Sequence, residues 1–243
     1  MKNFSSSPNN LMKPKTNEFR SGFTLIEMLV SITIITVITS VVFLQSSRFN
    51  SSILLSNIAY EMALSIREAQ VYGLSVRGLG SDEIALSQSQ TRFKRGYGIL
   101  LDGSSLNGAP LTSMALFADT YPLEIETGDK LYTGGTGGDA VISNLNLRKG
   151  YTITNFCIIK DNRYCYVQSG PNDLSLSSGR AVIYFLRPYP EAVIHDNTVS
   201  GLSNPAASAE ITVSSPDRST SKLVRIYQTG QIEVVSGTIS NTP

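Results

Sequence analysis

A long apolar segment near the N-terminus constrains this chain more than any other feature of its sequence. From Phe23 to Leu44 the chain runs for 22 residues of apolar and small hydroxyl side chains, interrupted by one ionisable residue, Glu27. A helix rises about 1.5 Å per residue, so this segment is long enough to cross a hydrocarbon core of roughly 30 Å. A carboxylate within such a helix costs roughly 2.5–3.5 kcal/mol unless something pairs with it. The sequence therefore predicts a membrane-spanning helix in which Glu27 has a partner and a purpose.

The residues before this segment are polar and mostly basic. They hold four cations against one acid: Lys2, Lys13, Lys15 and Arg20 against Glu18. Positive charge keeps this flank in the cytoplasm, so we expect the C-terminal bulk of the chain on the other side of the membrane. A secretory signal has a shorter apolar region followed by small residues, whereas here a glycine precedes a longer run. Two interpretations stay open: an uncleaved anchor, or a leader of residues 1–22 that is cut between Gly22 and Phe23.

The hexapeptide Gly22-Phe23-Thr24-Leu25-Ile26-Glu27 resembles the prepilin cleavage site of type IV pilins and type II secretion pseudopilins. The resemblance implies that a prepilin peptidase cuts after Gly22 and that the new amine of Phe23 is N-methylated. It also implies that Glu27 pairs with the Phe23 amine of a neighbouring subunit, which sets the register of assembly because a buried charge without its partner is strongly disfavoured. The implied partners are the peptidase, other pilin or pseudopilin subunits, and an inner-membrane assembly platform. The alternative is a membrane anchor with an incidental glutamate.

Residues 23–80 are predicted to form one long stem helix. No Gly or Pro occurs between Phe23 and Tyr72, and 50 helical residues would span about 75 Å. Residues 23–44 are apolar all round, whereas residues 45–80 carry one apolar stripe at helical spacing that must pack against the rest of the chain. Glycines mark the expected end of the helix: Gly73, Gly78 and Gly80. Major pilins often have a Gly or Pro in the stem, so their absence favours a minor subunit.

Residues 81–243 change to short strand-like runs separated by turn residues. The expected strands are Tyr97–Leu101, Met114–Phe117, Leu123–Glu126, Thr152–Ile159, Tyr164–Gln168, Ala181–Leu186, Ala192–Ile194, Glu210–Val213, Leu223–Gln228 and Gln231–Val235. Thr229-Gly230 is expected to turn the last hairpin. The predicted fold class is α+β, with the long N-terminal helix packed on an antiparallel β-sheet domain.

Several short patterns in this region resemble H-type pseudopilins and the minor pilins related to them. They are Arg67-Glu68-Ala69-Gln70, Gly96-Tyr97-Gly98-Ile99, Ala115-Leu116-Phe117-Ala118-Asp119, Val224-Arg225-Ile226-Tyr227 and Gly230-Gln231-Ile232-Glu233-Val234. The other interpretation is that they are ordinary strands and turns.

The chain has two cysteines, Cys157 and Cys165, which flank a predicted hairpin. A three-residue loop from Lys160 to Asn162 would place them opposite each other on one face. A two-residue loop would place them on opposite faces, since side chains alternate along a strand. Because both thiols are expected outside the cytoplasm, a disulfide is predicted.

Little in the sequence suggests chemistry on a substrate. The single histidine, His195, is expected near an exposed turn and cannot form a two-histidine metal site; no enzyme activity and no cofactor are predicted. A net charge of +1 without a basic stripe argues against nucleic acid as a partner. Three acids, Glu126, Asp129 and Asp139, have oxygen ligands for calcium but meet no spacing rule, so no metal site is predicted.

The sequence therefore predicts a minor pilin or pseudopilin, anchored by a single pass in the inner (cytoplasmic) membrane and then assembled into a type IV pilus or a type II secretion pseudopilus. Two other functions stay open. The β domain could be a binding module at a pilus tip, for adhesion or DNA uptake, or the chain could be an exported, membrane-anchored protein without a filament role.

Overall fold

The computed structural model describes residues 22–75, 95–121, 128–135, 138–168, 170–186 and 188–236, with the backbone alone for residues 44–50. The chain divides into two units between Ser47 and Arg48.

Helix α1 runs without a break from Leu25 to Leu74, as the absence of helix breakers predicts. Its segment Leu25–Phe43 is long and apolar enough to cross a membrane. Every side chain from Phe23 to Phe43 is exposed in the single chain. So much contiguous apolar surface is unfavourable in water, so this segment suits lipid or contact with other apolar helices.

The second half of α1 buries one apolar stripe in the core of the β domain. The stripe consists of Leu55, Ala59, Met62, Ile66 and Ala69, at spacings of three and four residues. Gly73 belongs to the same face and lies inside the helix. A Cβ at Gly73 would lie 2.8 Å from the Cβ of Phe185. Gly73 therefore lets α1 approach strand β7 (Arg180–Phe185) closely, and the helix ends one residue later, at Leu74, close to the predicted end.

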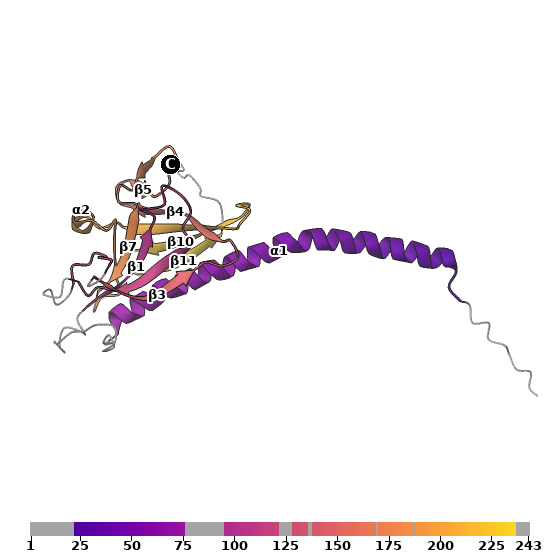
Figure 1. Ribbon diagram of the computed structural model, residues 1–243, viewed down its shortest axis with the longest axis horizontal. Coiled ribbons are helices and arrows are strands. Elements are labelled where there is room, and N and C mark those ends of the chain that lie inside the picture. Colours follow the sequence, from indigo (N-terminus) through magenta and orange to yellow (C-terminus); the bar gives the residue numbers. More distant parts are fainter. Residues whose placement is uncertain are drawn as a thin grey trace, which may run out of the picture. The chain divides into compact units, whose positions relative to one another are not determined.

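The β domain consists of two sheets, whereas the strand pattern of the sequence predicted one (Figure 1). The five-stranded sheet has the order β3-β2-β1-β7-β8, with β3 Ala140–Asn146, β2 Ser113–Ala118, β1 Tyr97–Asp102 and β8 Ala192–His195. The six-stranded sheet has the order β11-β10-β9-β4-β5-β6, with β11 Ile232–Ser236, β10 Ser221–Tyr227, β9 Ser208–Ser214, β4 Thr152–Ile159, β5 Arg163–Cys165 and β6 Asp173–Ser175. Twisted sheets seldom exceed about ten strands without splitting into two, which is the physical reason for the difference.

The α+β class is confirmed: one long N-terminal helix precedes two sheets in which every strand pair except β5–β6 is antiparallel. A single core cluster joins α1 to both sheets, with side chains such as Ile66, Ile183 and Ile211. An isolated antiparallel bridge between Leu111 and Ile153 links the segment before β2 to β4.

Three elements were missed by the strand pattern. Strand β3 has three polar residues among its seven, β6 has three residues, and α2 (Val199–Ser203) is a five-residue helix capped by Thr198. The structure also shortens one expected strand, Tyr164–Gln168, to Arg163–Cys165. The predicted strand Leu123–Glu126 lies outside the described residues, as do Gly78 and Gly80.

Candidate processing and assembly site

The predicted cleavage site lies just before α1. Gly22 is in exposed, irregular backbone, and no described atom lies within 4 Å of the place that a Cβ would occupy there. The side chain of Phe23 is 78% exposed. Within the described part of the chain, the peptide bond between these two residues is thus accessible to a peptidase.

Thr24 is the residue that starts the helix. Its Oγ1 accepts a hydrogen bond from the backbone N–H of Glu27 (3.3 Å), and its carbonyl oxygen accepts one from Met28 (3.2 Å). No role was predicted for Thr24 from the sequence. The signal was present, because a threonine followed three positions later by a glutamate is the capping-box pattern of helix N-termini.

Glu27 is the third residue of α1 and the one acid of its first turn. A carboxylate here is stabilised by the positive end of the helix dipole. Its side chain is exposed, and within residues 22–75 and the other described ranges it has no ion pair. Glu27 therefore has a local role at the helix start and is also available to a group from outside the chain. The pairing with an amine of Phe23 remains a prediction.

The hydroxyl groups of the apolar half of α1 are satisfied within the helix. Each of five donates to the carbonyl oxygen four residues earlier, at 2.7 or 2.8 Å: Ser31, Thr33, Thr36, Thr39 and Ser40. In a bilayer every polar group must find a partner within the protein. These internal bonds therefore make the segment compatible with lipid despite its hydroxyl residues.

The acids considered for calcium have structural roles. The carboxylate of Asp139 accepts three backbone N–H groups, from Thr120 (2.8 Å), Tyr121 (2.9 Å) and Thr133 (2.7 Å). Asp129 accepts the N–H of Leu131, two residues on. Among the described residues no group of three His, Cys, Asp or Glu side chains could hold a metal ion. Glu126 lies outside these residues.

Two buried titratable groups lie near this loop. Asp119 is fully buried and accepts the N–H of Lys130 (2.7 Å); burial, with the charge of Asp139, raises its pKa to about 7. His195 is also fully buried, as the last residue of β8, so the expectation of an exposed turn was wrong. Burial lowers the pKa of His195 to about 4, and its Nδ1 accepts the N–H of Asn197 (3.1 Å). The imidazole is therefore neutral near pH 7 and part of the fold.

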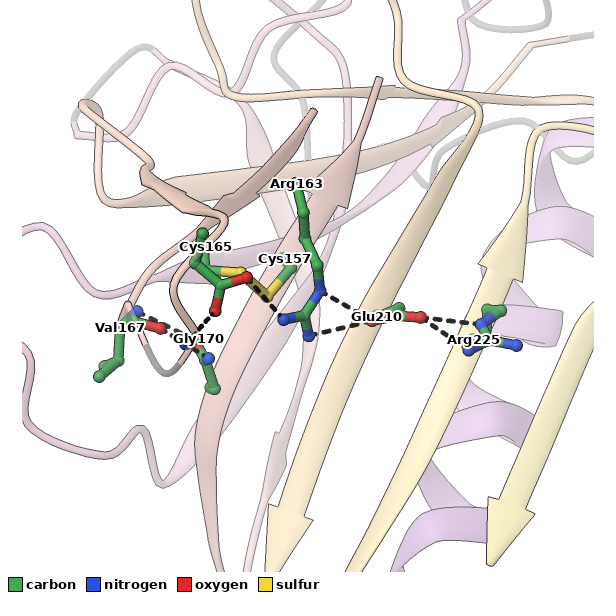
Figure 2. A network of polar contacts seen from close by, with 9 residues as sticks. Cys157, Arg163, Cys165, Val167, Gly170, Glu210 and Arg225 are labelled. Atoms are coloured by element: carbon green, nitrogen blue, oxygen red, sulfur yellow. Dashed lines mark hydrogen bonds and ion pairs between the residues drawn. A yellow bond between two sulfur atoms is a disulfide. The ribbon is translucent and has the colours of Figure 1, made fainter. Parts of the chain in front are cut away.

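The outer face of the six-stranded sheet carries a row of alternating charges (Figure 2). Arg163 on β5 pairs with Asp173 on β6 at 2.8 Å and with Glu210 on β9 at 3.1 Å. Arg225 on β10 pairs with the other oxygen of Glu210 at 2.8 Å. The Glu210 carboxylate thus joins two arginines, and with Asp173 the row links four strands.

Cys157 and Cys165 form a disulfide beside this row (Figure 2). They lie directly opposite each other on β4 and β5, and the connection is Lys160–Asn162, with the N–H of Lys160 bonded to the carbonyl oxygen of Asn162. This register is the one that the three-residue loop predicted. The bond ties the short strand β5 to the core strand β4.

Taken together, an accessible glycine precedes a capped apolar helix, and a β domain follows that helix; this arrangement points to a structural subunit. The sequence model of the prokaryotic N-terminal methylation motif matches residues 19–43 of this chain. The match supports the type IV pilin and pseudopilin family, whose members are processed by prepilin peptidase and assemble with other pilins. The comparisons with curated proteins and with solved structures found no match.

Proposed function

We propose that this chain is a minor pilin or pseudopilin, most like the H-type, which is assembled into a type IV pilus or a type II secretion pseudopilus. The observation that carries the proposal is the start of α1: the methylation motif coincides with an accessible Gly22–Phe23 bond and a helix capped at Thr24. The unbroken helix Leu25–Leu74 supports a minor role, because bulk subunits often carry a Gly or Pro in this region.

The proposed sequence of events begins in the inner membrane. Residues 1–22 form the cytoplasmic leader, residues 23–44 span the membrane, and residues 45–80 continue the stem into a β domain of residues 81–243 outside the cytoplasm. The peptidase cuts after Gly22 and the amine of Phe23 is methylated, which keeps its positive charge. On assembly, Glu27 pairs with the Phe23 amine of a neighbouring subunit, and this pair sets the register because either charge alone would be left in an apolar bundle.

Mass spectrometry of the N-terminus tests processing directly. The protein from membranes of its native host should begin with N-methyl-Phe23, and a Gly22→Val variant should keep its leader. A native protein that retains residues 1–22 would refute the proposal and favour a simple membrane anchor.

Assembly is tested separately with Glu27→Val. This variant should be cut and methylated normally but should be depleted from sheared filaments, since the amine of its neighbour has no partner. Ser31→Val, one turn further along the same helix, is the matched control and should assemble. Normal incorporation of Glu27→Val would show that the glutamate does not set the register.

A further inference from the structure

A cavity of about 460 Å³ lies between the second half of α1 and the β3 strand with its following turn. Helix residues Leu54 and Ile58 line one side, and Leu145, Leu147 and Tyr151 line the other. All five side chains pack at least partly against the core. The volume falls within the range of about 300–1,000 Å³ that is usual for binding pockets. This space is called the α1–β3 groove below.

One wall of the α1–β3 groove is a sheet edge that no described strand covers. Strand β3 is the last strand of its sheet, and the N–H of Leu147 donates to the carbonyl oxygen of Thr112 (2.8 Å). Because backbone groups alternate in direction along a strand, those of Leu145 also face β2, and those of Asn144 and Asn146 face away from it. An edge of this kind is a template on which an extended peptide can add as a further strand.

The two ends of the groove carry opposite charges. The hydroxyl of Tyr151 donates to the carbonyl oxygen of Ser51 (3.0 Å), which places the Arg148–Tyr151 turn beside Ser51. Glu61 lines the groove ten residues further along α1, about 15 Å away. Arg148, Lys149 and Glu61 are exposed and make no ion pair with any residue that the structure describes. A strand of four or five residues would span this distance, at about 3.3 Å per residue.

We propose that the α1–β3 groove binds an extended segment of another protein chain that carries acidic residues at one end. The segment adds to the open edge at Asn144 and Asn146 and lays its apolar side chains on Leu54 and Ile58. Its carboxylate meets Arg148 and Lys149, the basic end of the groove. This interaction goes beyond the filament function proposed above and does not depend on it.

A labelled peptide tests the groove with the full-length protein in detergent micelles. The probe is a fluorescein-labelled octapeptide in which valine alternates with threonine and which ends in two glutamates; its twin ends in two lysines. Fluorescence anisotropy should show saturable binding of the acidic peptide, at least tenfold tighter than that of its twin. The difference should shrink as salt is raised, because exposed charges are screened. No binding at millimolar peptide, or equal binding of the twins, would overturn the proposal.

Variants locate the binding. Asn146→Pro removes one N–H group that faces outward and makes no bond to β2. This change should weaken binding of the acidic peptide roughly three- to tenfold, whereas Asn146→Ala keeps the N–H group and should bind the peptide normally. The double variant Arg148→Glu, Lys149→Glu should reverse the preference between the two peptides. Circular dichroism melts identify any variant that has lost its fold. If Asn146→Pro does not fold, the charge-reversed double variant alone tests where the peptide binds. Unchanged preference in a folded charge-reversed protein would place the site elsewhere and refute the groove.

Discussion

Gln70 of α1 donates a hydrogen bond from its side-chain nitrogen to the carbonyl oxygen of Gly230, 160 positions later in the chain. The same nitrogen donates to the carbonyl oxygen of Pro190 at 2.8 Å. Gln70 is 3% exposed; its bond to Gly230 is buried and its bond to Pro190 is partly buried. One amide on the stem thus holds the turn between the last two strands and the segment before β8.

Replacing Gln70 should loosen this connection. Gln70→Ala leaves the buried carbonyl oxygen of Gly230 and the partly buried one of Pro190 without this donor, and we expect the free energy of unfolding to fall by about 1–3 kcal/mol. Gln70→Glu should cost more, because a carboxylate would face the two carbonyl oxygens. Urea unfolding of the purified protein in detergent measures both. Glu61→Ala, an exposed change on the same helix, should stay within about 0.5 kcal/mol of wild type; a similar loss in all three variants would contradict the explanation.

Gly98 is required by the ring of Phe117 on the neighbouring strand. A Cβ at Gly98 would lie 2.7 Å from two atoms of that ring. Gly98→Ala should therefore lower the free energy of unfolding by about 1–3 kcal/mol through overpacking. The double variant Gly98→Ala, Phe117→Leu makes room for the methyl group, so its loss should be smaller than the sum of the two single losses. Strict additivity would mean that the two side chains do not compete for space.

The disulfide is expected to stabilise the edge of the six-stranded sheet. Cys157 and Cys165 are eight positions apart, and closing so short a loop contributes about 2–3 kcal/mol in the chain-entropy description. In urea unfolding, the double variant Cys157→Ser, Cys165→Ser should have a free energy of unfolding that is lower by that amount. Alkylation before and after reduction, followed by mass spectrometry, checks the bond in wild type. If the protein from the native host takes up alkylating reagent without reduction, the thiols are not bonded there.

The charged row on the same sheet depends on Glu210. Glu210→Gln leaves Arg163 and Arg225 facing a neutral amide. We expect a loss of about 2–3 kcal/mol, less than for a fully buried pair because both arginines keep part of their hydration. The matched control is Asp102→Asn, which breaks the half-exposed pair with Arg180 and should cost less than about 1 kcal/mol. Equal losses would show that burial does not distinguish the two pairs.

The parts of the fold that follow from local sequence were predictable. The apolar run without Gly or Pro indicated α1, and the loop length between Cys157 and Cys165 indicated their register. The division into two sheets was not predictable, because it depends on pairings such as β1 with β7 across some 80 residues. Strand β3 was missed because its polar residues hide the alternation of a strand at an open edge.

The candidate site likewise contains residues that could be predicted from the sequence and residues that could not. The proposed processing and assembly residues, Gly22, Phe23 and Glu27, belong to one local motif, so they could be named from the sequence alone. Glu210 could not, because its partner Arg163 is 47 positions away. His195 was misplaced because a neighbouring Asp-Asn pair resembles a surface turn, whereas its pairing with Val182 buries it.

Stability should depend on pH through Asp119. Its pKa is about 7 in the folded protein and about 3.8 in the unfolded chain. Between these values the folded protein holds a proton that the unfolded chain releases, so this contribution to stability is lost as the pH rises from about 4 to 7 and is constant above 7. His195 acts in the opposite direction: its folded pKa of about 4 means that stability is lost as the pH falls from about 6.5 to 4. The two effects partly cancel in the wild-type curve.

The variant Asp119→Asn separates them, because it leaves His195 in place and cannot ionise. Its stability relative to wild type should increase as the pH rises from 5 to 7, by on the order of a few kcal/mol, and should level off at pH 8. Urea unfolding at pH 5, 6, 7 and 8 measures this difference. Asp217→Asn is the control, since Asp217 is exposed and hydrogen bonds from Ser215 and Ser219 lower its pKa to about 2, so it stays ionised throughout. A difference between Asp119→Asn and wild type that is constant or decreases with pH would mean that Asp119 is ionised in the folded protein, and that the interior around Asp139 accommodates both charges.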